Sequence, residues 1–144
     1  MREIKYIVVH CTAGKSDQTT QSIKQYWASV LGWKTYGYHY LIAADGTVEN
    51  LVDESKPTNG VKGYNANSIH VCYKGGFGGK DTRTQHQKNA LQSLLTILKH
   101  KYPKAKIKGH RDFSPDLNGD GKITPNEWVK LCPCFDAQAE YAKL

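Results

Sequence analysis

Residues 6–9 read Tyr-Ile-Val-Val, an unbroken apolar run that ends at His10. Consecutive apolar residues are typical of a strand that is covered on both faces, as strands of parallel sheets are. Further strand-like segments follow at Ile69 to Tyr73 and, more briefly, at Ala105 to Lys108. We therefore expect these segments to be strands of one sheet.

Two helices are predicted between these strands. The first has apolar residues at helical spacing from Ile23 to Leu31, and Gly32 follows as a plausible C′ residue. The second begins at a capping box, Thr84-Gln85-His86-Gln87, in which the threonine accepts from first-turn amides and the glutamine reaches back. Pro103 ends this second helix because proline cannot donate the next backbone hydrogen bond.

A hairpin and two short terminal helices complete the prediction. Asp45-Gly46 is a strong turn between strands at Tyr38 to Ile42 and Thr47 to Val52. Short helices are expected from Pro125 to Leu131 and from Phe135 to Lys143. The order β-α-β-β-β-α-β predicts an α/β protein with a single mixed β-sheet flanked by helices. Ligand residues at strand ends would then gather at one rim of that sheet.

Length and charge bound the kind of protein. With 144 residues the chain can form a real core, and we expect one domain over residues 1–144. Its net charge of +7 suits an anionic polymer such as nucleic acid or cell wall, or simply a solvated basic surface. No run of Lys and Arg resembles a nucleic-acid arm, so nucleic acid is not the expected partner. Nothing in the sequence requires more than a monomer.

The ends of the chain and its apolar runs give an expectation for location. No apolar stretch is long enough to span a membrane, so we expect no membrane insertion. No signal peptide precedes the first strand, which predicts a cytoplasmic start, or secretion if a leader has been removed.

Two histidines and one cysteine are the candidate metal ligands. His10 and His110 each directly follow a strand-like run, and Cys132 lies in a loop that contains Pro133. Two imidazoles and one thiolate leave the fourth position of a tetrahedral zinc ion for water, as catalytic zinc sites do. Either histidine alone is better explained as a hydrogen-bonded polar residue at a strand end, but the pair favours a metal site. Cys134 is the alternative to Cys132.

The remaining cysteines fit a core rather than a disulfide framework. Cys11 and Cys72 lie in or beside apolar strands, where a free cysteine usually behaves as a small core residue. Only Cys132 and Cys134 lie in a loop that could deliver a ligand.

These residues resemble the zinc-dependent N-acetylmuramoyl-L-alanine amidases of the type 2 family, which includes phage lysozymes and peptidoglycan-recognition proteins. Several motifs carry the resemblance, in the family's order and over nearly the whole chain. They are Val8-Val9-His10-Cys11-Thr12-Ala13, Gly37-Tyr38-His39-Tyr40, Asp45-Gly46-Thr47-Val48, Gly63-Tyr64-Asn65-Ala66-Asn67-Ser68-Ile69, Gly109-His110-Arg111-Asp112 and Lys130-Leu131-Cys132-Pro133. Such an ordered set is far more specific than any single motif.

The resemblance implies an activity and a partner. It implies hydrolysis of the amide between N-acetylmuramic acid and L-alanine in peptidoglycan or a muropeptide, as in an endolysin that acts at the cell wall after release. A non-catalytic peptidoglycan-binding module of the same fold is the alternative.

The resemblance also implies roles for individual residues. The zinc ligands would be His10, His110 and Cys132. Because a thiolate donates more charge than a third imidazole, the zinc-bound water would be less acidic, and nearby donors would have to offset this. Tyr38 and Lys130 would be those donors, and either could pass a proton to the leaving amine.

Simpler interpretations of these two residues remain open: packing for Tyr38, and a charge at a helix end for Lys130. No carboxylate base is evident, because Asp112 and Glu127 are better explained as structural. Substrate-binding residues are not predicted.

Three departures from the family pattern stand out. Gly60 lies where family members often carry a histidine, and His70 lies where a small residue is common. Residues 115–128 are an insertion between the second histidine and Lys130.

The insertion contains a calcium-type loop. Residues 116–127 match the EF-hand pattern, with Gly121 at the sharp turn. The candidate calcium ligands are Asp116, Asn118, Asp120, Lys122, Thr124 and Glu127. Pro115 argues against an entry helix, so this would be half an EF-hand, and the same residue types also favour an ion-free turn. Bound calcium could order the segment that delivers Lys130 and Cys132.

Overall fold

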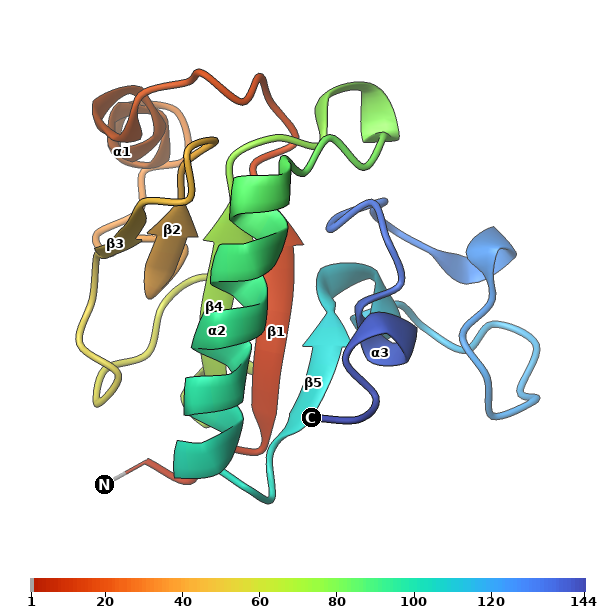
Figure 1. Cartoon of the computed structure of the whole chain (residues 1–144). Helices are drawn as coiled ribbons and strands as arrows, with labels where there is room; N and C mark the ends of the chain where they lie inside the picture. The colour runs from red at the N-terminus through yellow and green to blue at the C-terminus, as the bar shows by residue number, and fades with distance from the viewer. Residues whose placement is uncertain (1) are drawn as a thin grey trace.

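A computed structural model describes residues 2–144, and its centre is a five-stranded sheet with the order β3-β2-β4-β1-β5 (Figure 1). The strands are β1 (Tyr6–Cys11), β2 (Tyr40–Ile42), β3 (Val48–Asn50), β4 (Ser68–Tyr73) and β5 (Lys106–Gly109). Neighbouring strands are parallel except for β3, which is antiparallel to β2. The predicted α/β class with a single mixed sheet is confirmed.

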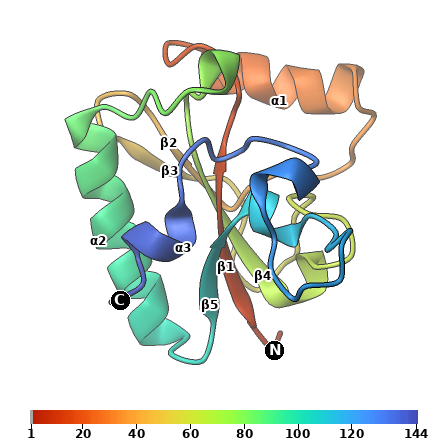
Figure 2. The ribbon, with the colours of Figure 1, turned by 90° about the vertical axis from the view of Figure 1, so that its right-hand side faces the viewer.

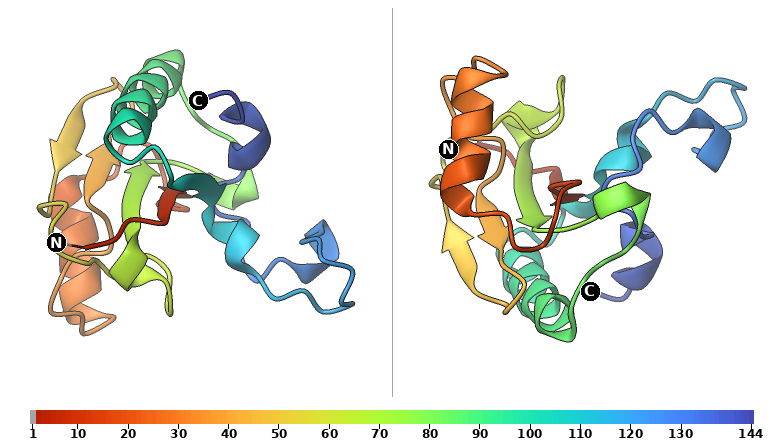
Figure 3. Two further views of the ribbon diagram at one scale, coloured as in Figure 1. Left: turned by 90° about the horizontal axis from the view of Figure 1, so that it is seen from below. Right: turned by 90° about the horizontal axis from the view of Figure 1, so that it is seen from above.

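Helices cover the two faces of this sheet. Helix α2 (Gln85–Lys101) packs Leu91, Leu95 and Leu98 against one face, and α1 (Thr20–Ser29) packs Ile23 and Trp27 near the other. Figure 3 shows α1 and α2 on opposite sides of the sheet. The short helix α3 (Ala137–Glu140) lies beside β5 on the side of α2 (Figure 2). Among residues 2–144, no helix is long and apolar enough to cross a membrane.

The alternation of β1 decides which side chains reach the open face. Ile7, Val9 and Cys11 belong to the core under α2, so Val8 and His10 point to the opposite face. In the pairing of β1 with β5, Val9 lies opposite Gly109. The next residues, His10 and His110, therefore meet at the carboxyl edge of the sheet.

The start of the second helix is predicted correctly, whereas the bounds of the first helix differ from the prediction: it begins at Thr20 rather than at Ile23. The Thr84 capping box is present, with the Thr84 side chain accepting from Gln87 and the Gln87 side chain accepting from the Thr84 amide. The first helix ends at Ser29 rather than at Leu31, and Gly32 follows with a left-handed φ of 66°. Leu31 therefore lies beyond the helix and is not one of its core residues.

Other predicted bounds are too long. Pro125 to Leu131 is not a helix but a single 3₁₀ turn, Pro125–Glu127, because Trp128 is extended and Val129 donates its amide to the Ser114 hydroxyl. The last helix is Ala137–Glu140 rather than Phe135 to Lys143. Strand β2 begins at Tyr40, so Tyr38 precedes it. The segment after β5 extends away from the sheet before it returns to α3 (Figure 3).

Candidate functional site

The predicted ligands come together at the carboxyl edge of the sheet. His10, His110 and Cys132 each offer a ligand atom, and these atoms all lie within 4.8 Å of one another. The Cys132 Sγ lies 3.9 Å from His10 Nδ1, and the rings of His10 and His110 are 4.9 Å apart between centroids. Two imidazoles and a thiol at this spacing fit one tetrahedral metal ion that keeps a position for water.

Backbone contacts hold Cys132 in place. The Cys11 amide donates to Cys132 Sγ at 3.1 Å, and the Arg111 amide donates to the Cys132 carbonyl at 2.9 Å. The Tyr73 hydroxyl donates to the carbonyl of Pro133 at 2.6 Å. A Cβ at Gly109 would lie 2.7 Å from Pro133 Cδ, so only glycine lets the loop approach this closely. Together these contacts fix the position of the Cys132 sulfur beside the two histidines.

Cys134, the alternative ligand, points elsewhere. Its Sγ lies 3.7 Å from Cys11 Sγ and 3.8 Å from the carbonyl oxygen of Gly76. It does not belong to the group formed by the two histidines, so the geometry favours Cys132.

The electrostatics keep both histidines neutral. Burial, followed by the charges of His70 and His110, lowers the pKa of His10 well below its usual value. Burial and the neighbouring Lys130 ammonium lower the pKa of His110 to about 4. At neutral pH both rings therefore carry a lone pair that a metal can use.

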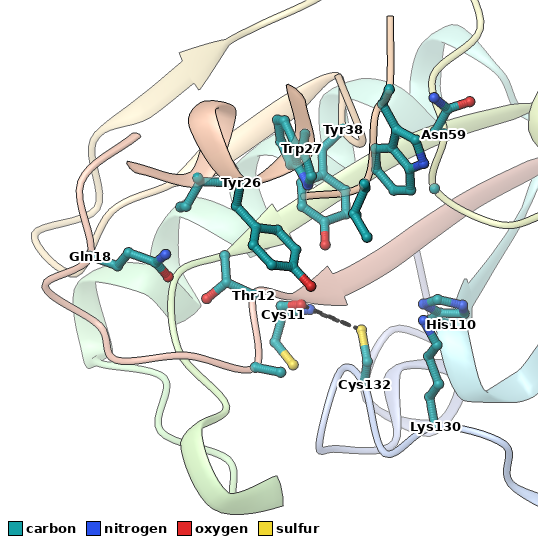
Figure 4. A pocket seen from close by; sticks show the side chains of 15 residues that line it. Cys11, Thr12, Gln18, Tyr26, Trp27, Tyr38, Asn59, His110, Lys130 and Cys132 are labelled. Atoms are coloured by element: carbon teal, nitrogen blue, oxygen red, sulfur yellow. Dashed lines mark hydrogen bonds between the residues drawn. The ribbon is translucent and has the colours of Figure 1, made fainter. Parts of the chain in front are cut away.

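Tyr38 and Lys130 both line the cavity beside this cluster (Figure 4). The Tyr38 ring lies 4.9 Å from the His10 ring between centroids, and burial raises the pKa of Tyr38, so it remains a phenol that can donate. Lys130 is exposed and lies in a loop. It cannot complement a helix dipole, because the helix expected there is absent, and that alternative interpretation is removed.

The cavity itself measures about 370 Å³ and contains a wall that was not predicted as substrate-facing. Tyr26, Leu31 and Trp33 line it on the side of α1, and Asn59 and Gly60 line it elsewhere. Tyr26 is 50% exposed and Leu31 is 41% exposed, although helical spacing assigned both to a buried helix face. The sequence did contain a signal for this wall. The predicted apolar face of the first helix is wider than the packing of Ile23 and Trp27 requires, so its other apolar residues are left exposed.

The two carboxylates considered as bases serve the backbone. Asp112 accepts from the Gly109 amide at 2.8 Å. Glu127 accepts from the amides of Leu117, Asn118 and Thr124. Both contacts fit the structural roles expected of these residues.

The calcium-type loop folds on its own hydrogen bonds. Carboxylate oxygens of Asp116, Asp120 and Glu127 lie within 4.8 Å of one another. However, Asp116 accepts from the amides of Gly119 and Gly121, and Glu127 is held by the amides described above. The Asn118 side-chain oxygen accepts from the Asp120 amide, and the exit helix expected after Glu127 is absent. These contacts account for the loop as a turn, so calcium binding stays a prediction from the sequence without support from the structure.

Comparisons with known proteins give the chain its relatives. The family described as N-acetylmuramoyl-L-alanine amidase matches residues 1–127. The endolysin of Enterobacteria phage K11 is 37% identical over 143 residues, which is 95% of this chain and 85% of that protein.

Solved structures share the fold. The Ph2119 endolysin from Thermus scotoductus MAT2119 bacteriophage Ph2119 has a TM-score of 0.74 and 27% identity, over 92% of this chain and 79% of the other. Human PGRP-IBETAC, solved with glycosamyl muramyl pentapeptide, has a TM-score of 0.69 and 21% identity, over 85% of this chain and 80% of the other. The family match ends at residue 127, before Cys132, so it is the folded structure that joins Cys132 to the two histidines.

Proposed function

The chain belongs to the N-acetylmuramoyl-L-alanine amidase family and is a peptidoglycan amidase, and on that premise we propose that His10, His110 and Cys132 hold its catalytic zinc ion. The observation that carries the proposal is the convergence of the three ligand atoms within 4.8 Å of one another beside an open cavity. A structural zinc site would instead be closed by a fourth side chain.

The chain's own residues then have distinct tasks in hydrolysis. Bound zinc would supply an acidic water molecule and polarise the scissile carbonyl. The Tyr38 hydroxyl and the Lys130 ammonium are donors for the oxyanion that develops on the scissile carbonyl, and each such donor is worth about 3 kcal/mol in comparable sites. Lys130 is exposed and cationic, so it is also suited to pass a proton to the leaving amine.

We propose that the substrate binds in the cavity beside the ligand cluster. Tyr26, Leu31 and Trp33 offer apolar surface on one side of the ligand cluster, and Asn59 offers an amide elsewhere. A second hollow, of about 190 Å³, shares His110 and Lys130 with the first, so the groove continues past the proposed zinc site. The muramyl pentapeptide bound by the human structural neighbour is the same class of ligand. We assign peptidoglycan and muropeptides as substrates on this basis.

The biological role follows from the relatives. Phage endolysins related over nearly the full chain make cell-wall lysis the role we propose, with the wall as the place of action. The chain is proposed to act as one domain over residues 1–144 and as a monomer, because the ligand cluster and cavity are formed within one chain.

The test measures amine release from purified muropeptide and metal content in the same preparations. The wild-type protein should contain one zinc ion per chain and release the amino terminus of L-alanine. Chelation and Cys132→Ser should abolish both the metal and the activity. Cys134→Ser is the matched control, because it removes a thiol from the same loop but outside the ligand group, and it should retain both. Wall binding without amine release by the zinc-loaded wild-type protein would instead support the non-catalytic module.

A further inference from the structure

His70 is a buried histidine that the proposed reaction does not use. It lies in β4, its side chain has no exposed surface, and it faces the same side of the sheet as His10. The His70 Nδ1 lies 2.8 Å from His10 Nε2, and the His70 Nε2 lies 2.9 Å from Asn65 Oδ1. A line of hydrogen bonds therefore leads from a loop residue to a proposed zinc ligand.

The donor and acceptor of each hydrogen bond in this line can be assigned by starting from Asn65. The Val61 amide donates to Asn65 Oδ1 at 2.8 Å, which identifies that atom as an acceptor. The His70 Nε2 must then carry the hydrogen that it donates to Asn65 Oδ1. A neutral His70 is left with a lone pair on Nδ1, so the His10 Nε2 must carry a hydrogen and donate it to His70.

The consequence appears at the other nitrogen of His10. With hydrogen on Nε2, the lone pair of His10 lies on Nδ1, and Nδ1 is the atom 3.9 Å from Cys132 Sγ. We propose that His70 is a positioning residue that fixes the tautomer and ring orientation of His10, so that Nδ1 is presented to the zinc ion. This inference rests on the proposed zinc site. Partners of this kind typically contribute about 10- to 100-fold to metal affinity.

His70 is itself held rigidly enough for this task. Its backbone amide donates to His39 Nδ1 at 3.0 Å, and the two imidazoles are nearly parallel, with centroids 6.0 Å apart. The His39 Nε2 in turn donates to the Lys56 carbonyl at 2.7 Å. Neither ring is free to rotate without breaking a buried hydrogen bond.

Gly60 makes the space that the His70 ring occupies. A Cβ built on Gly60 would lie 2.3 Å from His70 Nδ1 and 2.4 Å from its Cγ, so no side chain fits at position 60 while His70 is present. This explains the paired departures noted in the sequence, a glycine at 60 and a histidine at 70. In this protein the imidazole beside His10 is that of His70 in β4. A side chain at position 60 of the loop is excluded because the His70 ring fills the space that it would need.

The test compares replacements that keep or remove the acceptor. His70→Leu removes it at similar volume, whereas His70→Asn offers its carbonyl oxygen near the position of Nδ1. Zinc dissociation constants, measured by competition with a chromogenic chelator, should rise about 10- to 100-fold for His70→Leu and change much less for His70→Asn. The exchange variant Gly60→His with His70→Gly should recover most of the affinity lost in His70→Leu, because it returns an imidazole to the same space.

Two further readouts separate positioning from simple structural support. Nuclear magnetic resonance of metal-free protein with isotope-labelled histidine should show His10 with hydrogen on Nε2 in the wild type and a mixture of tautomers in His70→Leu. Thermal midpoints of the metal-free proteins report any general loss of folding, and His70→Asn and the exchange variant keep the test usable if His70→Leu does not fold.

The outcomes are distinguishable. A wild-type protein that binds zinc, together with unchanged affinity and tautomer in His70→Leu, overturns the inference and leaves the proposed function intact. A wild-type protein that binds no zinc overturns the metal site and this inference together.

Discussion

Tyr38 and Lys130 bring two different donors to the same cavity. Tyr38 is packed against His10 and Trp27, whereas Lys130 lies in an exposed loop. A packed phenol and an exposed ammonium should contribute differently to catalysis, because preorganised donors need no rearrangement in the transition state. Their removal can therefore be predicted separately.

Tyr38→Phe should lower kcat by about 100- to 1000-fold and leave KM and zinc content nearly unchanged, because it removes one oxyanion donor and keeps the ring that packs on His10. Initial rates of amine release from muropeptide give both constants. Tyr36→Phe is the matched control, since Tyr36 contacts Trp27 in the same aromatic group but does not line the cavity. Equal losses in the two variants would contradict the role assigned to Tyr38.

Lys130→Met should lower kcat by about 100-fold at neutral pH, since the methionine keeps the aliphatic stem but cannot donate a proton. Zinc content should stay at the wild-type level because Lys130 is not a ligand. The comparison is Lys122→Met, which removes a lysine from the exposed loop outside the cavity and should retain full activity. Retained activity in Lys130→Met would show that the leaving amine is protonated by another group.

At the scale of residues, the sequence allowed candidate ligands to be predicted from their motifs, but it did not predict the side-chain contacts that depend on how two strands are paired. The proximity of His10, His110 and Cys132 could be predicted because their motifs suggest a shared metal ion, and the structure brings the three side chains together. The contact between His10 and His70 could not, because it requires the parallel pairing in which Val8 lies opposite His70. Single-chain patterns do not encode which residues of two strands, 60 positions apart, face each other.

At the scale of elements, one arginine joins the C-terminal helix to the rest of the protein. The Arg83 side chain is 2% exposed and lies over the Phe135 ring at 3.4 Å from its centroid. It donates to both carboxylate oxygens of Glu140, at 2.6 and 2.9 Å, and to Asp81 at 2.9 Å. These contacts fasten α3 to the loop that precedes α2.

Arg83→Met should reduce the free energy of unfolding by about 2 kcal/mol. A broken buried ion pair typically costs more, but Glu140 and Asp81 are partly exposed, so solvent screens part of the loss. Urea unfolding followed by circular dichroism measures the change. Lys5→Met is the control, because the Lys5–Glu3 pair is exposed on both sides and should change stability by less than about 0.5 kcal/mol.

The same cluster predicts a dependence of stability on pH. Hydrogen bonds from Arg83 lower the pKa of Glu140, and Arg83 also lowers the pKa of Asp81 against the opposing effect of burial. A carboxylate whose pKa is lowered by folding stabilises the folded state above its unfolded pKa, and this contribution is lost as the pH falls through the folded pKa.

Wild-type stability should therefore fall as the pH drops below about 4.5, the ordinary value for a glutamate, and Arg83→Met should show a shallower fall. Urea midpoints between pH 3 and 7, taken for zinc-free protein, isolate this effect from metal release. Parallel curves for the two proteins would contradict it.

Element bounds were predicted well where a cap marks them and poorly where only apolar spacing was available. The Thr84 cap located the start of α2, and Pro103 located its end within two residues of Lys101. The interpretation of residues 125–131 as a helix failed because Trp128 and Val129 are needed to return the loop to Ser114. Tertiary contacts outweighed the weak helical preference of that short segment.

At the scale of the whole molecule, the proposed zinc ion connects three distant parts of the chain. His10 is the next-to-last residue of β1, His110 follows β5, and Cys132 belongs to the loop that leads back to α3. The segment 115–128 joins the last two; most of its residues are exposed, and it extends away from the sheet (Figure 3). Metal binding should therefore stabilise the return of the C-terminal part more than it stabilises the core.

Zinc removal should lower the thermal midpoint by about 12 °C. A ligand present at about 1,000 times its dissociation constant adds about 4 kcal/mol to folding, and each kcal/mol shifts the midpoint of a chain of this size by about 3 °C. Differential scanning calorimetry with zinc and with a chelator measures the shift, and Cys132→Ser should give the same low midpoint under both conditions. Limited proteolysis of the chelated protein should cut first between residues 114 and 131, because the loop then loses its tie to His10 and His110, while β1 and α2 keep their packing. A midpoint that does not respond to zinc, or cleavage that begins within α2, would contradict a metal ion that joins these three segments.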